Sequence, residues 1–290
     1  MIKYYIKFNS VVLVAFFFLS TKGLKSAVKD TSATKYTFFQ NHKSDGLIIC
    51  NYRLTYHPDS SDTNTRSEYL QLSIGKYLTK FQSPSSRMRD SLTSIAVNLP
   101  RAERTQTTID FYTRNILSLP KSNFRYIILK VPSTGKISYY DWIGPNLYRY
   151  EEPDPLFKWA ITNTKTTIAG YACQKATTAF AGRKFEAWFT REIPVSDGPY
   201  KFNGLPGLIT KVRDLDNQYS FELVKISRIQ SVNGITLPGK PAILTTKKAL
   251  QTGQESYNAG LADRMASMGN NINASNQQRS KRHLNPLEVR

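Results

Sequence analysis

The stretch GYACQKATTAFAGRKFEAWFTREIPVSDGPYKFNGLPGLITKVRD, residues 170–214, decides the fold class of this chain. The apolar and aromatic runs that it contains or continues, at 166–180, 183–190 and 208–214, are typical of strands and are separated by Gly and Pro. No helical pattern lies between them, and strands this close in sequence pair antiparallel. The stretch therefore predicts an antiparallel sheet.

Within it, the segment KFNGLPGLITKV, residues 201–212, packs two glycines and a proline between short apolar runs. A phosphate-binding loop would need a helix directly after it, and a P-loop adds a Lys followed by Ser or Thr. Neither feature follows, because residues 208–212 have the pattern of a strand. The segment is interpreted as a chain reversal.

The turn itself is predicted at Leu205–Leu208. Pro206 fits the second position of a type II turn, and Gly207 accepts the positive φ of the third position. Gly204 adds conformational freedom just before the turn. These three residues are therefore expected to have a structural role.

The connection 194–207 is longer than a simple hairpin loop of roughly two to five residues, which is typical of loops with a function. Leu205, Leu208 and Ile209 are expected to turn into the core together with Phe202. The loop is expected to border or cover one apolar face of the sheet.

Outside this stretch, alternating apolar residues predict further strands. A helix is predicted over 85–98, because Met88, Leu92 and Ile95 recur there at helical spacing. A weak helix is predicted over 247–269, while 101–118 is ambiguous. The expected fold is mainly β with a few helices: a curved antiparallel sheet or a half-open barrel. Strands are expected at 48–56, 124–132, 136–144, 146–153, 158–163 and 218–229, with a hairpin about Gly75 over 68–81.

The N-terminus has the features of a secretory signal peptide. Lys3 and Lys7 precede an apolar run from Val11 to Leu19, and small or polar residues follow. The run is shorter than the about 20 apolar residues that cross a bilayer. We expect a signal peptide over 1–23, with a cut as late as residue 27 left open. An uncleaved anchor is the alternative.

After the signal peptide, the sequence predicts three segments. They are a flexible leader over 24–45, a β-rich domain over 46–245, and a weak helix with a flexible basic tail over 246–290. The predicted location is the periplasm or the outer membrane, with the mature chain soluble after cleavage.

The chain is strongly basic, with 40 Lys and Arg against 21 Asp and Glu and a formal net charge of +19. This balance favours contact with an anionic surface, such as an envelope polymer or lipid head groups, and solubility alone is the other explanation. An exported protein is not expected to meet nucleic acid. The tail residues Arg279, Lys281 and Arg282 could touch an anionic partner or stay solvated.

Cys50 and Cys173 are the two cysteines of the chain. Export permits a disulfide bridge between them, which would close a long loop. Equally, each cysteine fits a small buried apolar position in a strand. Both alternatives stay open at the level of sequence.

The segment from Gly170 to Ile209 resembles the GLPGLI proteins, a secreted family of Gram-negative bacteria. Gly204–Ile209 spells the six letters of the family name, and NPLE at Asn285–Glu288 resembles a common terminal motif of these proteins. The resemblance is close from about Trp159 to Leu223. It implies export and a β fold, and it implies no catalytic residue, cofactor or substrate.

The sequence contains no recognised catalytic or metal-binding motif. The three histidines are far apart, and no His-Glu-x-x-His or Gly-x-Ser-x-Gly pattern occurs. Asp214 and Asp216 are typical of a hairpin turn, because the later Gly and Glu of a calcium loop are absent. No cofactor and no metal are expected.

The resulting hypothesis is a non-catalytic envelope protein that binds a lipophilic ligand, an extended peptide or an envelope partner. The predicted ligand-contacting residues, beside the 194–207 loop, are Trp188, Phe202, Leu205 and Leu208. One alternative is an assembly accessory that contacts anionic envelope polymers. Another is an enzyme that uses an unrecognised carboxylate pair, Glu186 with Asp197.

Overall fold

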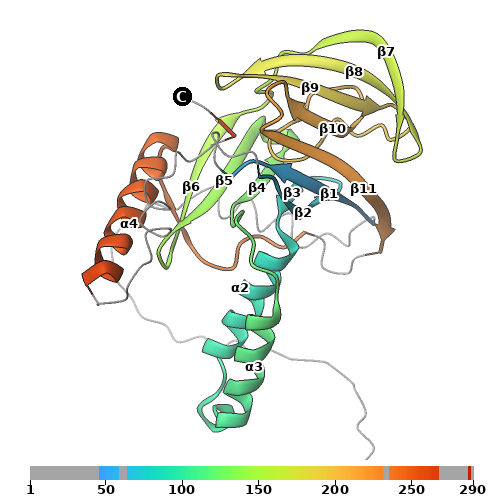
Figure 1. Ribbon diagram of the computed structural model, residues 1–290. Helices are drawn as coiled ribbons and strands as arrows, with labels where there is room; N and C mark the ends of the chain where they lie inside the picture. The colour runs from blue at the N-terminus through green and yellow to red at the C-terminus, as the bar shows by residue number, and fades with distance from the viewer. Residues whose placement is uncertain (1–45, 59–63, 231–234, 268–286, 289–290) are drawn as a thin grey trace, which may run out of the picture.

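The computed structural model describes residues 46–58, 64–230, 235–267 and 287–288, with side chains of the last helix described to residue 261. The expected signal peptide, leader and basic tail cluster lie outside the described residues. Within these ranges, twelve strands form one open sheet in the order β12-β6-β5-β4-β3-β2-β1-β11-β10-β9-β8-β7 (Figure 1). The expected fold class, mainly β with a few helices in an open sheet, is confirmed.

The strands follow the alternating patterns of the sequence closely. Their bounds are β1 (Leu47–Tyr56), β2 (Arg66–Ile74), β3 (Thr79–Gln82), β4 (Ile127–Val131), β5 (Lys136–Ile143), β6 (Asn146–Pro153), β7 (Ala160–Ile168), β8 (Tyr171–Phe180), β9 (Arg183–Thr190), β10 (Leu208–Asp214), β11 (Tyr219–Ile229) and β12 (Ala242–Leu244).

One pairing departs from the antiparallel expectation. β12 runs parallel to β6, with Ala242 opposite Leu147 and Leu244 opposite Arg149. Every other neighbouring pair of named strands is antiparallel. The exception arises because β12 does not follow β6 through a hairpin but returns from β11 to the far edge of the sheet, which is the kind of crossover that parallel pairing requires.

The sheet curls around one main core. Buried residues from β1–β5 and from β8–β11 belong to a single apolar cluster, which also contains Tyr200, Phe202 and Leu205 of the 194–207 connection. The Phe202 ring lies 6.4 Å from Phe221 of β11, centroid to centroid. The loop therefore folds inside the curve of the sheet, as its apolar residues predicted.

A smaller apolar cluster lies on the opposite face, over β4 to β6. Because side chains alternate along a strand, Ile128 faces the main core while its neighbour Leu129 belongs to the second cluster with Val131 and Tyr140. This part of the sheet is consequently apolar on both faces.

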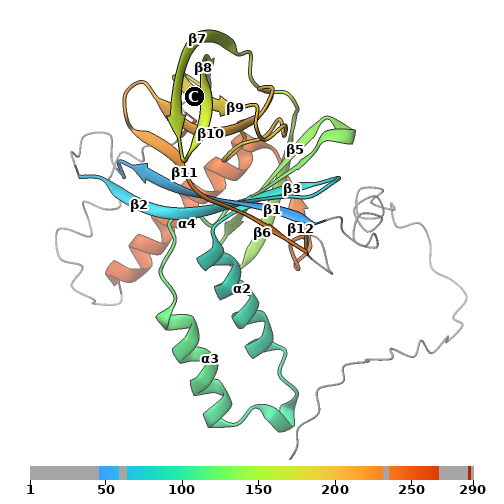
Figure 2. The same cartoon turned by 90° about the vertical axis from the view of Figure 1, so that its right-hand side faces the viewer.

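The predicted helix over 85–98 is present as α2 (Pro84–Val97), and the ambiguous segment contains η1 (Arg101–Glu103) and α3 (Gln106–Ser118). α2 begins with Ser83, whose hydroxyl accepts a hydrogen bond from the Ser86 amide, while α3 begins with a capping box. The two helices form a hairpin that projects away from the sheet (Figures 1 and 2).

The predicted C-terminal helix is present as α4 (Lys247–Ser267), which lies along β5 and β6 (Figure 1). The Thr246 hydroxyl accepts a hydrogen bond from the Ala249 amide at the start of this helix. Among the described residues, no helix combines the length and the apolar character needed to cross a membrane.

The segment Gly204–Gly207 leads directly into β10 and not into a helix. Its hydrogen bonds differ from the type II pattern, because the Leu208 amide donates to Ile193 O and not to Leu205 O. The Gly207 amide donates to Leu205 O instead, at 2.8 Å. The start of β10 takes the bond that would have closed the wider turn, so a tighter three-residue turn forms around Pro206.

Gly207 is required by the close approach of another strand. Its φ is +153°, and a Cβ atom built on it would lie 2.0 Å from the carbonyl oxygen of Thr190, at the end of β9. This separation is far below any van der Waals contact, so a side chain at position 207 would push the loop off β9.

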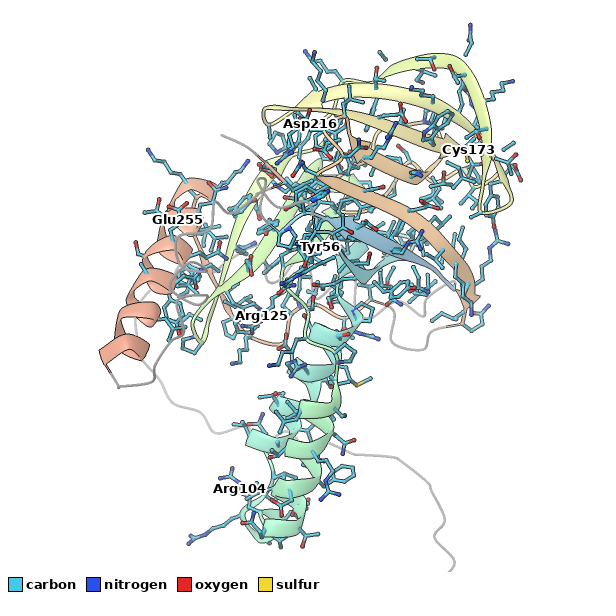
Figure 3. All side chains as sticks on the ribbon, in the orientation of Figure 1. Tyr56, Arg104, Arg125, Cys173, Asp216 and Glu255 are labelled. Atoms are coloured by element: carbon cyan, nitrogen blue, oxygen red, sulfur yellow. The ribbon has the colours of Figure 1, made fainter. Side chains whose placement is uncertain are left out.

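Cys50 and Cys173 are both buried free thiols, so the disulfide considered from sequence is not formed. Cys50 lies on β1 and Cys173 on β8, four strand positions away in the sheet. Neighbouring strands are about 4.8 Å apart, whereas a disulfide needs Cα atoms within about 7 Å. Figure 3 shows Cys173 toward the β7–β8 end of the sheet, where its Sγ lies 3.2 Å from Thr210 Oγ1.

Candidate functional site

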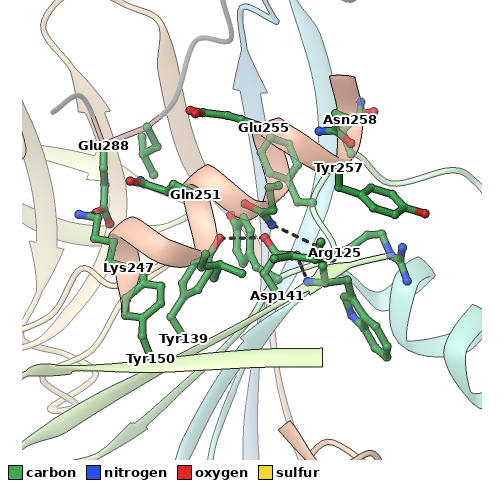
Figure 4. Close-up of a pocket in the computed structure, with 18 of the residues that line it drawn as sticks. Arg125, Tyr139, Asp141, Tyr150, Lys247, Gln251, Glu255, Tyr257, Asn258 and Glu288 are labelled. Atoms are coloured by element: carbon green, nitrogen blue, oxygen red, sulfur yellow. Dashed lines mark hydrogen bonds and ion pairs between the residues drawn. The ribbon is translucent and has the colours of Figure 1, made fainter. Parts of the chain in front are cut away.

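A cavity of about 730 Å³ lies between α4 and the sheet (Figure 4). Strands β5, β6 and β11, with residues 123–126 just before β4, form its floor and α4 its roof, while the 194–207 loop and residues 287–288 reach it from one side. The lining includes Arg125, Tyr126, Tyr139, Asp141, Trp142, Tyr150, Tyr200, Lys247, Gln251, Gln254, Glu255, Tyr257, Asn258, Leu287 and Glu288.

The helix is held close to the sheet at one point. A Cβ atom built on Gly253 would lie 2.6 Å from Cδ1 of Ile143, so glycine lets α4 approach β5 without displacing the end of that side chain. Next to it, Gln254 Nε2 donates to the Trp142 carbonyl oxygen at 3.4 Å. The amide side chains of α4 therefore face the aromatic floor across the cavity.

Tyrosine rings form much of the floor. The Tyr139 ring stacks on Tyr150 at 4.9 Å, and the Tyr126 ring lies 5.5 Å from both Tyr139 and Tyr200. Burial raises the pKa of all four phenols well above the ordinary value. The floor is consequently a neutral aromatic surface across the physiological pH range.

A fully enclosed lysine lies beneath this floor. The Lys201 side chain is 0% exposed, and its ammonium lies 2.5 Å from Glu152 and 2.6 Å from Glu288. The same ammonium lies 5.1 to 5.4 Å from the ring centres of Tyr139, Tyr150 and Tyr200. Two carboxylates and three aromatic rings thus compensate the buried charge.

Glu288, in the last described segment, ties α4 to this cluster. Its carboxylate accepts a hydrogen bond from the Tyr200 hydroxyl at 2.7 Å and pairs with Lys247 of α4. Burial alone would raise the pKa of Glu288, but the charge of Lys201 and the hydrogen bonds from Lys201, Lys247 and Tyr200 outweigh it and hold the pKa below its ordinary value. Glu288 is therefore a carboxylate at neutral pH, and it closes one end of the cavity.

The other end of the cavity is polar and less compensated. Asp141 accepts hydrogen bonds from the Trp142 amide at 2.8 Å and from the Tyr139 hydroxyl at 3.3 Å. Burial nevertheless raises the pKa of Asp141 above its ordinary value. The indole Nε1 of Trp142 is buried and has no hydrogen-bond partner among the described residues, so it remains available to donate.

These features suit binding more directly than catalysis. Flat aromatic rings offer stacking surface, while Asp141, the Trp142 indole and the α4 amides offer hydrogen bonds at fixed positions. Within the described part of the chain, no three His, Cys, Asp or Glu side chains are grouped so as to hold a metal ion.

The residues predicted to contact a ligand do not line this cavity. Phe202 and Leu205 are each 1% exposed and Leu208 is 0% exposed, all within the main core. Trp188 is half-buried on β9, where its Nε1 donates to Glu186 at 3.2 Å and Lys175 lies over its ring. The structure therefore uses the first three to anchor the loop.

The carboxylates of the enzyme alternative are also engaged separately. Glu186 pairs with Lys175 and, at 3.3 Å, with Arg213. Asp197 accepts from the buried ammonium of Lys130 at 2.5 Å, and Lys130 donates as well to the carbonyls of Gly198 and Phe202. Neither carboxylate lines the cavity, and Asp197 with Lys130 fixes the loop in place.

Sequence reasoning missed Asp141, Tyr139, Lys201 and Glu288 as members of one site. Two features of the sequence could have indicated this site. Strands β5 and β6 each carry two tyrosines, and Lys201 directly follows Tyr200 in a loop otherwise rich in apolar residues. The terminal motif Asn285–Glu288 was noticed, but nothing in the sequence indicated where it lies.

Comparison with protein-family models finds a match for only part of this chain. The model of a protein family described as "Protein of unknown function (Porph_ging)" matches residues 179–211, which comprise the end of β8, β9, the loop and the start of β10. No curated protein matches the chain.

Two solved structures share the fold, those of PNGF-II in the C2 and P21 space groups. Both are 12% identical to this chain and cover 73% of it, with TM-scores of 0.50 and 0.51. The similar region takes in 33% and 34% of the PNGF-II chain, so this protein corresponds to about a third of that chain. At this identity the likeness shows the fold alone.

Proposed function

We propose that the protein is an exported, non-catalytic protein of the cell envelope that holds an amphipathic ligand in the cavity beneath α4. The observation that carries the proposal is the cavity itself: about 730 Å³, with an aromatic floor and polar groups on α4 and β5. This volume falls in the range of roughly 300 to 1,000 Å³ that is typical of small-molecule sites.

The lining restricts the ligand class. A flat apolar part would stack on Tyr126 and Tyr139, while hydroxyl or amide groups would meet Asp141, Gln254 and the unpaired Trp142 indole. A purely aliphatic chain would leave the Trp142 indole N–H buried without a partner among the described residues, which costs about 1–3 kcal/mol. The ligand is therefore amphipathic; an extended peptide with an aromatic side chain satisfies the same requirements.

The cellular setting and the family are part of the same proposal. The signal-like run from Val11 to Leu19 supports export, and the letter-for-letter match at Gly204–Ile209 supports membership of the GLPGLI proteins. The family model over residues 179–211 supports a shared β9–loop–β10 unit. A periplasmic or outer-membrane location follows from these two proposals.

The test measures binding of N-phenyl-1-naphthylamine, a small fluorescent aromatic probe, to the mature chain. Tyr257 lines the cavity and is 38% exposed, whereas Tyr69 of β2 is 62% exposed and does not line it. Tyr257→Ala should weaken probe binding about threefold or more through lost stacking, while Tyr69→Ala should leave it unchanged.

Native mass spectrometry of protein purified from the envelope gives the second readout, and a bound molecule displaced by the probe would identify the natural ligand. The proposal fails if the wild type shows no saturable binding of the probe and carries no bound molecule, or if Tyr69→Ala and Tyr257→Ala weaken binding equally.

A further inference from the structure

A second hollow lies on the face of the sheet opposite the main core. It has a volume of about 370 Å³ and crosses β11, β1, β2 and β3. One row of paired residues forms its base: Ser227 lies opposite Ile49, Ile49 opposite Ser73, and Ser73 opposite Lys80. We call this hollow the Lys80 groove.

The Lys80 groove is positively charged. Lys80 is only 6% exposed, and its ammonium donates to the carbonyl oxygen of Thr236 at 2.8 Å. Arg87, in the first turns of α2, reaches the same groove. No Asp or Glu is among the residues that line it, and no carboxylate of the described chain forms an ion pair with Lys80 or Arg87.

The burial of Lys80 and its position near Arg87 disfavour the charged form of its side chain. Burial, and then the nearby charge of Arg87, lowers the pKa of Lys80 to about 8. By contrast, the buried Lys130 and Lys201 each have a carboxylate within 2.6 Å. Among the described residues, the Lys80 groove thus holds a buried cation without the carboxylate that Lys130 and Lys201 each have.

The remaining lining fits an oxyanion beside an apolar group. Gln71, Gln82 and Ser73 place neutral hydrogen-bonding groups around Lys80, while Leu47, Ile49, Ile229 and Ile235 make the other end of the groove apolar. The two ends are joined along β1 and β2, so one molecule of modest size could contact both.

We propose that the Lys80 groove binds a phosphate-type oxyanion, with Lys80 and Arg87 as its charged contacts and Gln71, Gln82 and Ser73 as neutral donors. Charge-assisted hydrogen bonds to phosphate are about twice as strong as neutral ones, and a bound oxyanion would compensate both cations. The oxyanion is either free in solution or the head group of a lipid-like molecule whose apolar part lies over Ile49 and Ile229.

The experiment uses the mature chain and two probes, inorganic phosphate and dihexanoyl phosphatidic acid below its micellar concentration. Thermal unfolding is followed with increasing probe, against sodium chloride of equal ionic strength, and affinities are measured by calorimetry. The variants are Lys80→Met, Arg87→Gln, and Arg101→Gln as the control, because Arg101 is an exposed arginine of η1 away from the groove.

Phosphate should raise the unfolding temperature of the wild type and of Arg101→Gln, but not of Lys80→Met. Lys80→Met should weaken binding about tenfold or more, and Arg87→Gln by a smaller factor. Without probe, Lys80→Met should unfold at a temperature equal to or above that of the wild type, because it removes a buried uncompensated charge. That second readout distinguishes loss of binding from loss of folding.

Tighter binding of the phosphatidic acid than of inorganic phosphate would support the lipid-like source, and equal binding the free one. The proposal is overturned if neither probe protects the wild type beyond the effect of chloride, or if Lys80→Met is protected as strongly as the wild type.

Discussion

The ammonium of Lys201 lies 2.6 Å from the carboxylate of Glu288, inside a cage of tyrosine rings. The contact joins the 194–207 loop to residues 287–288, which the chain reaches only after α4. It also closes one end of the aromatic cavity. The stability of the sheet and the shape of the cavity consequently depend on the same ion pair.

Glu288→Gln should destabilise the fold by about 2 kcal/mol, because it leaves the enclosed Lys201 with one carboxylate in place of two. The measurement is chemical denaturation at pH 7. Glu222→Gln is the matched control: Glu222 pairs with Lys211 at 3.1 Å on the surface, and its loss should cost less than about 1 kcal/mol. Equal effects of the two variants would show that the buried pair has no special role.

The pH dependence of stability should differ in sign between two carboxyl groups of the cavity. The folded-state pKa of Glu288 is depressed, so its contribution is present above the ordinary value of 4.5 and is lost as pH falls through the folded-state pKa. The gap between wild type and Glu288→Gln should therefore shrink in acid.

Asp141 should behave in the opposite way. Its folded-state pKa is raised above 3.8, so stability falls as pH rises from the unfolded-state pKa to the folded-state pKa and changes no further above it. Asp141→Asn should stabilise the protein at pH 7 and give no gain at pH 3. Denaturation curves of both variants from pH 3 to pH 7 test these signs, and parallel curves would contradict them.

Gly207→Ala should prevent normal folding, with a cost of about 4 kcal/mol or more, because the new methyl group would overlap the Thr190 carbonyl. Gly204→Ala should cost only about 1–2 kcal/mol, since φ at Gly204 is +88° but the space beside it is open to 3.7 Å. Gly239→Ala is the control, because no atom lies within 4 Å of the added Cβ. Soluble yield and the thermal unfolding temperature rank the three variants by stability.

Both thiols should be detected in the unfolded chain without reductant, because Cys50 and Cys173 are free. In the folded protein Cys50 should resist maleimide, since burial, together with the charge of Asp197, raises its pKa to about 12. Intact-mass spectrometry after alkylation, with and without guanidinium, counts the labelled thiols. A mass two hydrogens lower, with no labelling on unfolding, would instead reveal a disulfide bridge.

The sequence was sufficient for the strands because their signals are local. The alternation from Ile48 to Tyr56, and the Gly and Pro that separate later runs, each arise within one element. The helix α2 was equally accessible, since its apolar spacing lies within 85–98. The parallel pairing of β12 was not, because it depends on where the chain returns after β11.

The cavity could not be predicted from sequence either, because it also depends on contacts between distant parts of the chain. Its walls come from residues 123–126, β5, β6, β11, the 194–207 loop, α4 and residues 287–288, which are distant in sequence and meet only in the folded sheet. Phe202, Leu205 and Leu208 were expected both to turn into the core and to contact a ligand beside the loop. The curl of the sheet encloses them instead.

The position of β1 has a consequence for how the chain acquires its structure. β1 is the first strand in sequence, yet it lies between β2 and β11, with Leu47 opposite Ile229. A nascent chain that has not yet released β11 leaves one edge of this strand without its partner, and such distant pairing is slow to form. Chaperones that recognise exposed strand edges should therefore bind truncated chains that end before Tyr219, and release those that extend beyond Ile229.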